Sequence, residues 1–221
     1  MSGPGPGPGT SETFMAREVA EVPEVAGPLC GGWTEAERVA SELRARSFPF
    51  AVICGRGSSG HAGVYLRYLI ETLCGLAVSA SAPSVVTSYC RSPRMNGALF
   101  ITISQSGRSP DLIAATRAAR QGGALTLAIV NDVASPAAIA ADLVLPIEAG
   151  PEQAVAATKT VVNSLVASAR TTHATTVMTS IQGFIGPPHS SSRAQLKAKD
   201  QLVLVPLWKR DHQAARGSSL S

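Results

Sequence analysis

The feature that most constrains the fold of this sequence is a series of five short apolar runs separated by segments with helical signals. A continuous apolar run bounded by Pro or Gly is typical of a parallel strand that is buried on both faces. Alternation of such strands with helices predicts an α/β fold of three layers, in which a five-stranded parallel sheet is flanked by helices. The five runs occupy residues 50–54, 76–80, 98–103, 125–130 and 143–147.

Helix starts are marked by capping residues. Thr34 and Glu37 have the spacing of a capping box, which predicts a helix that begins at Thr34. Ser109 is a predicted N-cap, and Pro110 fits the first helical position. The other predicted helical segments are residues 16–22, ended by Pro23, residues 59–73, a short segment from Ser135, and residues 154–167.

Composition divides the chain into one folded region and two ends. A length of 221 residues with 45% hydrophobic residues is sufficient for one well-buried core. Residues 1–14 begin with a Gly-Pro alternation and are predicted to be a disordered leader, residues 15–168 the folded domain, and residues 169–221 an irregular, disordered tail. The tail holds 7 of the 19 Lys and Arg residues but 2 of the 15 Asp and Glu residues. The folded part is therefore near neutral, which argues against a nucleic-acid partner.

Several other functional classes are discouraged by what the sequence lacks. The cysteines have neither CxxC spacing nor neighbouring histidine pairs, so we expect no metal site and no disulfide framework. No apolar run approaches the roughly 20 residues that a membrane span needs, and the N-terminus does not resemble a signal peptide. We expect a cytoplasmic protein with no membrane partner and no bound cofactor.

Three loops at predicted strand ends are candidates for ligand binding, because open parallel sheets bind ligands at the carboxyl ends of their strands. Residues 55–60 follow the first strand and combine glycines with Ser58 and Ser59. Residues 104–107, Ser-Gln-Ser-Gly, follow the third strand and precede the helix capped at Ser109. Backbone amides at a helix N-terminus and serine hydroxyls suit the oxygens of a phosphate group. A third loop, residues 152–158, is positioned to close over the rest of the ligand.

A dinucleotide site is an alternative interpretation of the first loop, since residues 55–60 also read GxGxxG. That fingerprint expects an acidic residue about 20 positions later, at the end of the second strand, to hold a ribose. Ser79, Ala80 and Ser81 stand there instead. An NAD(P)-dependent oxidoreductase is therefore the weaker interpretation, and a purely structural tight turn also stays open.

Four stretches together resemble the sugar isomerase (SIS) domain, as found in the isomerase half of glucosamine-fructose-6-phosphate aminotransferase and in related amino-sugar-phosphate isomerases and deaminases. They are residues 55–59, residues 82–85, residues 104–111 and residues 149–159, and they follow the order and spacing of the family. The resemblance implies the SIS variant of a flavodoxin-like or Rossmann-like sheet. It further implies a sugar phosphate surrounded by Ser59, Ser104, Gln105, Ser106 and Ser109, in a pocket lined by Gly57, Ser58, Val155 and Ala157.

The resemblance covers one SIS domain, whereas family enzymes usually contain two. In those enzymes the second domain supplies a glutamate for proton transfer and a histidine for ring opening, and neither motif is recognisable here. Isomerisation between aldose and ketose needs a base with a suitable pKa. Glu152 and Lys159 are the ionisable residues of the matching loops that stay as catalytic candidates, and each has an alternative role in helix packing. His61 follows the first serine loop, where a solvent-facing role is the simpler interpretation.

The sequence thus leaves two leading functions. One is sugar-phosphate binding within amino-sugar-phosphate isomerisation, deamination or glutamine-fructose-6-phosphate aminotransferase-type chemistry, with fructose 6-phosphate or glucosamine 6-phosphate as the ligand. The other is a non-catalytic module that senses a sugar phosphate. Whether the chain is itself an enzyme stays open, because the catalytic half of the family arrangement is not recognisable. Family architecture also implies a homodimer or pairing with another SIS domain.

Overall fold

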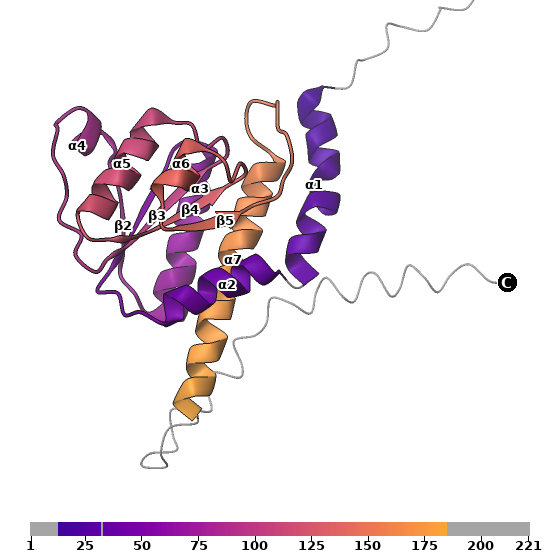
Figure 1. Cartoon of the computed structure of the whole chain (residues 1–221). Helices are drawn as coiled ribbons and strands as arrows, with labels where there is room; N and C mark the ends of the chain where they lie inside the picture. Colours follow the sequence, from indigo (N-terminus) through magenta and orange to yellow (C-terminus); the bar gives the residue numbers. More distant parts are fainter. Residues whose placement is uncertain (1–12, 32, 185–221) are drawn as a thin grey trace, which may run out of the picture. The chain divides into compact units, whose positions relative to one another are not determined.

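A computed structural model describes residues 13–31 and 33–184 of the chain (Figure 1). In this part of the chain, the strands form a single parallel sheet in the order β2-β1-β3-β4-β5. The five strands are β1 Ala51–Gly55, β2 Val78–Ala80, β3 Leu99–Ser104, β4 Leu125–Val130 and β5 Leu143–Pro146. The predicted fold class is therefore confirmed. Strand order reverses between β1 and β3, which places a topological switch point between these two central strands.

Alternate residues of each strand face the two helical layers, as the period of two in a strand requires. Ile53, Ile101 and Ile129 contribute to one apolar cluster with residues of α2, α3 and α7, whereas Val52 and Phe100 contribute to another with residues of α5. Figure 1 shows the sheet between these helices. Because both faces are covered, the strands are continuous apolar runs, and β3 is buried at every position.

The helices of the described residues fall between the strands as the alternation predicted. They are α1 Phe14–Gly31, α2 Thr34–Arg44, α3 Ser58–Leu69, α4 Ser84–Thr87, α5 Pro110–Gln121, α6 Pro136–Ala140 and α7 Lys159–Phe184, and a π-helical turn, Ile70–Cys74, extends α3. At α5 the cap and the first-turn proline lie where predicted, with Ser109 as N-cap and Pro110 at the first helical position. No described helix is long and apolar enough to cross a membrane.

The first helix is longer than the sequence predicted. Residues 16–22 were expected to form a short segment ended by Pro23, but α1 continues through both Pro23 and Pro28. A proline inside a helix removes one backbone hydrogen bond and clashes with the preceding turn. Burial of Ala26 and Leu29, which are 8% and 1% exposed, offsets that cost. Tertiary packing therefore overrides the local signal.

Helix α2 begins at Thr34, as predicted, but the capping box predicted there is wrong. Trp33 is the N-cap of α2 and Thr34 is the first helical residue, and the cap has no side-chain hydrogen bond. Trp33 is buried in the apolar cluster that includes Leu29, so burial of the indole fixes the start of the helix.

Both ends of the last helix differ from the prediction. It begins at Lys159 rather than near Ala154, and it continues to Phe184 rather than ending near Ala167. The expectation of an irregular segment after residue 168 is therefore wrong for residues 169–184. Ala167 and Ala174 are buried on this helix, so it still packs where its sequence becomes rich in Thr. The predicted leader up to residue 12 and the predicted tail from residue 185 lie outside the described residues.

Candidate functional site

The two serine loops lie side by side at the carboxyl edge of the sheet. Gly55, at the end of β1, pairs in register with Ile103, the residue before Ser104 on β3. The loop after β1 leads into α3 and the loop after β3 leads into α5. The sheet therefore brings two helix N-termini together at its switch point, where parallel α/β folds bind their ligands.

The first loop is shaped by its glycines. Gly57 has a φ of +52°, a backbone conformation that side chains with a Cβ rarely adopt, and it is the residue before α3. A Cβ at Gly55 would meet the carbonyl oxygen of Ser59 at 2.9 Å, so the turn also needs a small residue there. Ser58 and Ser59 occupy the first turn of α3 and are half-buried. Their amides have no acceptor within the helix, as is general for a first helical turn.

The second loop is held by its own hydrogen bonds. Ser104 is 5% exposed, and its hydroxyl accepts from the Gly107 amide at 3.1 Å. The Ser106 hydroxyl accepts from the Arg108 amide at 3.3 Å. Ser109 is the N-cap of α5 but makes no capping hydrogen bond with its side chain. These hydrogen bonds fix the conformation of the loop directly before the N-terminus of α5.

Gly107 fixes this loop against the next strand-end segment. Its φ is +61°, and a Cβ there would lie 2.1 Å from the Ser135 hydroxyl oxygen. The Gly107 carbonyl oxygen accepts from the Ala137 amide at 3.0 Å. Sequence reasoning missed this contact, because nothing local indicates that the Ser135 segment packs on the loop.

The arginines beside the loops are paired with carboxylates. Arg56 lies 2.5 Å from Asp111 at the start of α5, and Arg108 lies 3.0 Å from Asp132. Both arginine side chains are well exposed, so each pair adds little to stability. The positive ends of α3 and α5, together with their amides and hydroxyls, are therefore the main attraction for an anion at this edge.

The third loop is tied to the start of α7. The Glu152 carboxylate accepts from the Thr158 amide at 2.7 Å and from the Thr160 amide at 3.3 Å, and it also bonds both threonine hydroxyls. The Lys159 ammonium pairs with Glu21 of α1, and Lys159 is 3% exposed. Both catalytic candidates are thus engaged in contacts that stabilise α1 and α7, which favours the packing role that the sequence left open for each. Val155 of the same loop is 96% exposed.

Asn131 is a further residue of this edge that sequence reasoning did not select. It follows β4 directly, donates to the Gly150 carbonyl oxygen at 2.7 Å and accepts from the Ala149 amide at 2.9 Å. These two bonds fix the entry to the third loop. A polar residue at the end of a buried strand was the signal that could have found it.

Two other ionisable residues near the first loop, His61 and Cys54, have simple environments. His61 lies on α3 and is exposed. Cys54 is fully buried near the end of β1, and its burial raises the pKa of the thiol to about 11. The Cys54 thiol is therefore neutral at physiological pH and not an activated nucleophile. The described residues contain no group of three or more His, Cys, Asp or Glu side chains that could hold a metal ion.

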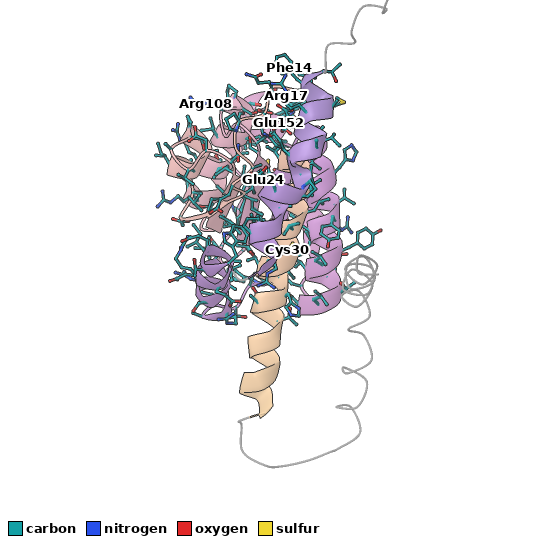
Figure 2. All side chains as sticks on the ribbon, turned by 90° about the vertical axis from the view of Figure 1, so that its right-hand side faces the viewer. Phe14, Arg17, Glu24, Cys30, Arg108 and Glu152 are labelled. Atoms are coloured by element: carbon teal, nitrogen blue, oxygen red, sulfur yellow. The ribbon has the colours of Figure 1, made fainter. Side chains whose placement is uncertain are left out.

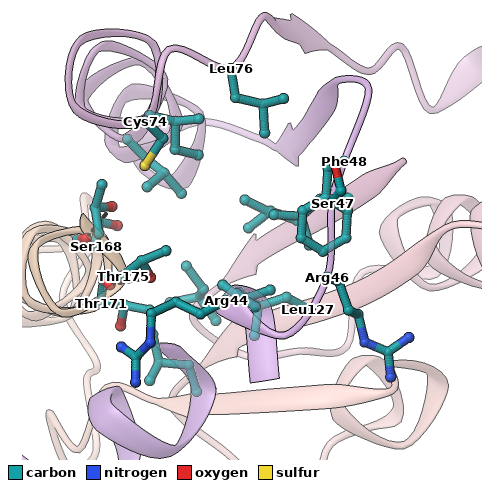
Figure 3. Close-up of a pocket in the computed structure, with 18 residues that line it drawn as sticks. Arg44, Arg46, Ser47, Phe48, Cys74, Leu76, Leu127, Ser168, Thr171 and Thr175 are labelled. Atoms are coloured by element: carbon teal, nitrogen blue, oxygen red, sulfur yellow. Dashed lines mark hydrogen bonds between the residues drawn. The ribbon is translucent and has the colours of Figure 1, made fainter. Parts of the chain in front are cut away.

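A cavity of about 390 Å³ lies at the opposite, amino half of the sheet (Figure 3). Apolar side chains such as Phe48, Leu76 and Leu127 form most of its wall, and Ser168 and Thr171 of α7 form a polar strip. None of the predicted site residues lines it. The cavity is therefore separate from the serine loops.

Comparison with known proteins agrees with this geometry. The SIS domain profile matches residues 50–174. The chain belongs to the SIS domain family. The resemblance seen in the sequence is thereby confirmed, and the SIS domain of this chain extends past residue 168 into the segment that the sequence had suggested was irregular.

Curated relatives of this SIS domain are much longer proteins. The glutamine--fructose-6-phosphate aminotransferase of Symbiobacterium thermophilum is 38% identical in an alignment of 165 residues that covers 70% of this chain and 26% of the relative. The enzyme of the same name from Pyrococcus horikoshii is 36% identical over 159 residues, with 72% of this chain and 26% of the relative covered. The chain spans about a quarter of the length of the curated relatives it matches.

Solved structures give the same assignment. A phosphosugar isomerase homologue from Silicibacter pomeroyi superposes with a TM-score of 0.71 at 42% identity, over 77% of this chain and 53% of that one. The C-terminal domain of the Francisella tularensis glucosamine-fructose-6-phosphate aminotransferase gives a TM-score of 0.67 at 26% identity, over 77% and 49%. This chain therefore matches about half of each of these two chains.

Proposed function

We propose that this SIS domain binds the phosphate group of a phosphorylated sugar between the two serine loops. The observation that carries the proposal is the pairing of β1 with β3, which sets two serine-containing helix N-termini beside each other at the switch point. Such a site attracts an anion through amide donors and helix dipoles, without needing an unpaired cation. Both arginines near the loops are already paired, in agreement with that mode of binding.

The proposed roles follow the order of the loops. Ser59 from α3 and Ser104, Gln105, Ser106 and Ser109 from the second loop surround the phosphate. Gly57 and Ser58 approach it through the backbone, while Val155 and Ala157 of the third loop line the sugar side of the pocket. Fructose 6-phosphate and glucosamine 6-phosphate are the ligands that we propose, since the longer relatives are named for fructose 6-phosphate.

We further propose that binding is part of amino-sugar-phosphate chemistry, with the base supplied by a second, different SIS domain. A base must reach the proton that it transfers and must have a suitable pKa. Glu152 and Lys159 are engaged in other contacts. That observation also favours the second candidate function, a module that senses a sugar phosphate without turnover.

Pairing with another SIS domain is also a proposal. The outward face of α3 exposes Val64, Tyr65 and Tyr68, at 54%, 40% and 65% exposure. Aromatic residues gathered on one exposed helix face are typical of an interface. Light scattering on the wild type and on a Tyr68→Glu variant tests this: the wild type is expected to be a dimer and the variant a monomer. A wild type that is monomeric, like the variant, would contradict the pairing.

The function is tested by melting temperatures with fructose 6-phosphate, glucosamine 6-phosphate and NAD, and by assaying the same samples for interconversion of the two sugars. A ligand that binds only the native state raises the melting temperature by mass action. A shift with the sugar phosphates and no turnover is the expected result for this chain alone. A shift with NAD alone would contradict sugar-phosphate binding, and turnover would contradict the proposal that the base comes from elsewhere.

A further inference from the structure

One face of α1 contacts the third loop and the start of α7. Glu18 is 5% exposed although it is charged, and its carboxylate accepts from the Gln153 amide at 2.5 Å and from the Ala154 amide at 3.1 Å. A carboxylate is rarely buried unless its oxygens are satisfied by donors. Here both oxygens are used on two consecutive amides of one loop.

Two further contacts lie on the same face of α1. Glu21 pairs with the buried Lys159, and the Val25 carbonyl oxygen accepts from Asn163 at 3.1 Å. Positions 18, 21 and 25 are three and four residues apart and therefore lie on one side of a helix. All three residues contact the segment that begins at Gln153 or the helix that follows it, so α1 supports that part of the chain.

The loop needs such support, because residues 151–158 form neither helix nor strand. Its entry is fixed by Asn131 and its exit by Glu152, as described above. Between these two points, the Glu18 carboxylate accepts hydrogen bonds from two backbone amides of the loop. Those amides lie directly before Val155 and within four residues of Ala157, the two residues proposed to line the sugar side of the pocket.

We infer that Glu18 is a positioning residue that sets the third loop for the hydroxyl-bearing part of the sugar, so that affinity for the sugar depends on α1 while affinity for the phosphate does not. The inference rests on the proposed function of the serine loops. Its physical basis is that the groups proposed to bind the phosphate belong to the β1–α3 and β3–α5 loops, whereas both hydrogen bonds of Glu18 are made to the third loop. Charge-assisted bonds to amides are stronger than neutral ones, which makes the carboxylate effective in this role.

The test compares Glu18→Gln and Glu18→Ala with the wild type in the full chain. Calorimetric titration gives the dissociation constants for fructose 6-phosphate, for glucosamine 6-phosphate and for inorganic phosphate. We expect Glu18→Ala to weaken binding of the sugar phosphates about tenfold, equivalent to about 1.4 kcal/mol, and Glu18→Gln to weaken it less. Binding of inorganic phosphate should stay within about twofold, because the serine loops are unchanged. Amide exchange at Gln153 and Ala154 should accelerate while exchange in β3 and β4 stays slow.

Glu24→Gln is the matched control, since Glu24 lies on the same helix (Figure 2) and is exposed. This variant should bind all three ligands like the wild type. Equal affinities of Glu18→Ala and the wild type for the sugar phosphates would overturn the inference, as would an equal loss for sugar phosphates and inorganic phosphate. If Glu18→Ala does not fold, the ligand affinities and the amide exchange of Glu18→Gln test the inference instead. A wild type that binds no sugar phosphate would instead refute the proposed function.

Discussion

The two edges of the sheet differ in how their polar groups are partnered. At the carboxyl edge, Ser104, Ser106 and Glu152 each accept hydrogen bonds from the backbone of their own loops. At the amino half, the hydroxyls of Ser168 and Thr171 are buried beside an apolar cavity and have no partner among the described residues. Fixed polar groups make a site that is preorganised for a ligand, whereas unpaired buried hydroxyls cost stability. The cavity at the amino half is therefore the poorer candidate for a sugar-phosphate site.

The difference also follows from where polar residues stand in the sequence. The serine loops interrupt the chain directly after buried strands, so their hydroxyls and amides lie at the sheet edge with helix N-termini behind them. Ser168 and Thr171 instead lie inside a helix that packs on apolar strands. Their side chains are small, and they leave the strand residues beneath them without full packing contacts.

The largest effect is expected from Gly107→Ala. The new Cβ would lie 2.1 Å from the Ser135 hydroxyl oxygen in a residue with a φ of +61°, so steric overlap and backbone strain add. We expect a loss of about 3 kcal/mol in the free energy of unfolding, with weaker binding of inorganic phosphate. Urea unfolding and calorimetric titration measure the two quantities.

Gly97→Ala is the matched control for that change. Gly97 has a φ of +72°, but the nearest atom to its Cβ would be 3.8 Å away. It should lose about 1 kcal/mol of unfolding free energy from strain alone and bind phosphate normally. Equal losses in both variants would show that the contact of the second loop with Ser135 is not tight.

Ser104→Ala tests the carboxyl edge directly. Removing the hydroxyl leaves the Gly107 amide without its acceptor and deletes one proposed contact to the phosphate. We expect about tenfold weaker binding of fructose 6-phosphate and a loss of about 1 kcal/mol in stability. Unchanged affinity would exclude Ser104 from the site.

Ser168→Ala is the counterpart at the amino half. It removes a buried hydroxyl that has no hydrogen-bond partner among the described residues, so the free energy of unfolding should rise by up to about 1 kcal/mol while affinity for fructose 6-phosphate stays the same. Thermal unfolding and titration of the two alanine variants give the comparison. A loss of sugar-phosphate affinity in Ser168→Ala would reverse the assignment of the two edges.

The smallest effect concerns Cys54, whose thiol pKa is raised to about 11 by burial, from 9.0. The native state then keeps this proton between pH 9 and 11 while the unfolded state releases it. The contribution of Cys54 to the free energy of unfolding is therefore complete below pH 9 and decreases as the pH rises to 11. We expect a Cys54→Ala variant to show less of this alkaline loss.

At pH 8, thiol reagents should modify the exposed Cys30, Cys74 and Cys90 and spare Cys54. Rapid labelling of native Cys54 would contradict its burial.

Local sequence was sufficient for the sheet and for the serine loops. Buried parallel strands need continuous apolar runs, and all five were found within a few residues of their observed bounds. Their carboxyl ends follow from the chain direction, which located Ser59 and Ser104 without any knowledge of helix packing.

The contacts that local sequence did not predict join residues far apart in the chain. Glu18 and Gln153 are 135 residues apart, and no periodic pattern links them. Likewise, α1 continues through Pro23 because Leu29 is buried against other elements, and α7 continues past Ala167 although its Ser and Thr residues give no apolar stripe. Tertiary packing decides these features, so they are visible only in the fold.

The most direct test of the central claim is the response of backbone amide resonances to fructose 6-phosphate. If the serine loops hold the phosphate, the amides of residues 57–59 and 104–109 should shift with a common dissociation constant, and those of residues 168–175 should stay fixed. Saturable shifts at residues 168–175, with none at the serine loops, would contradict the account and place the ligand in the cavity at the amino half of the sheet.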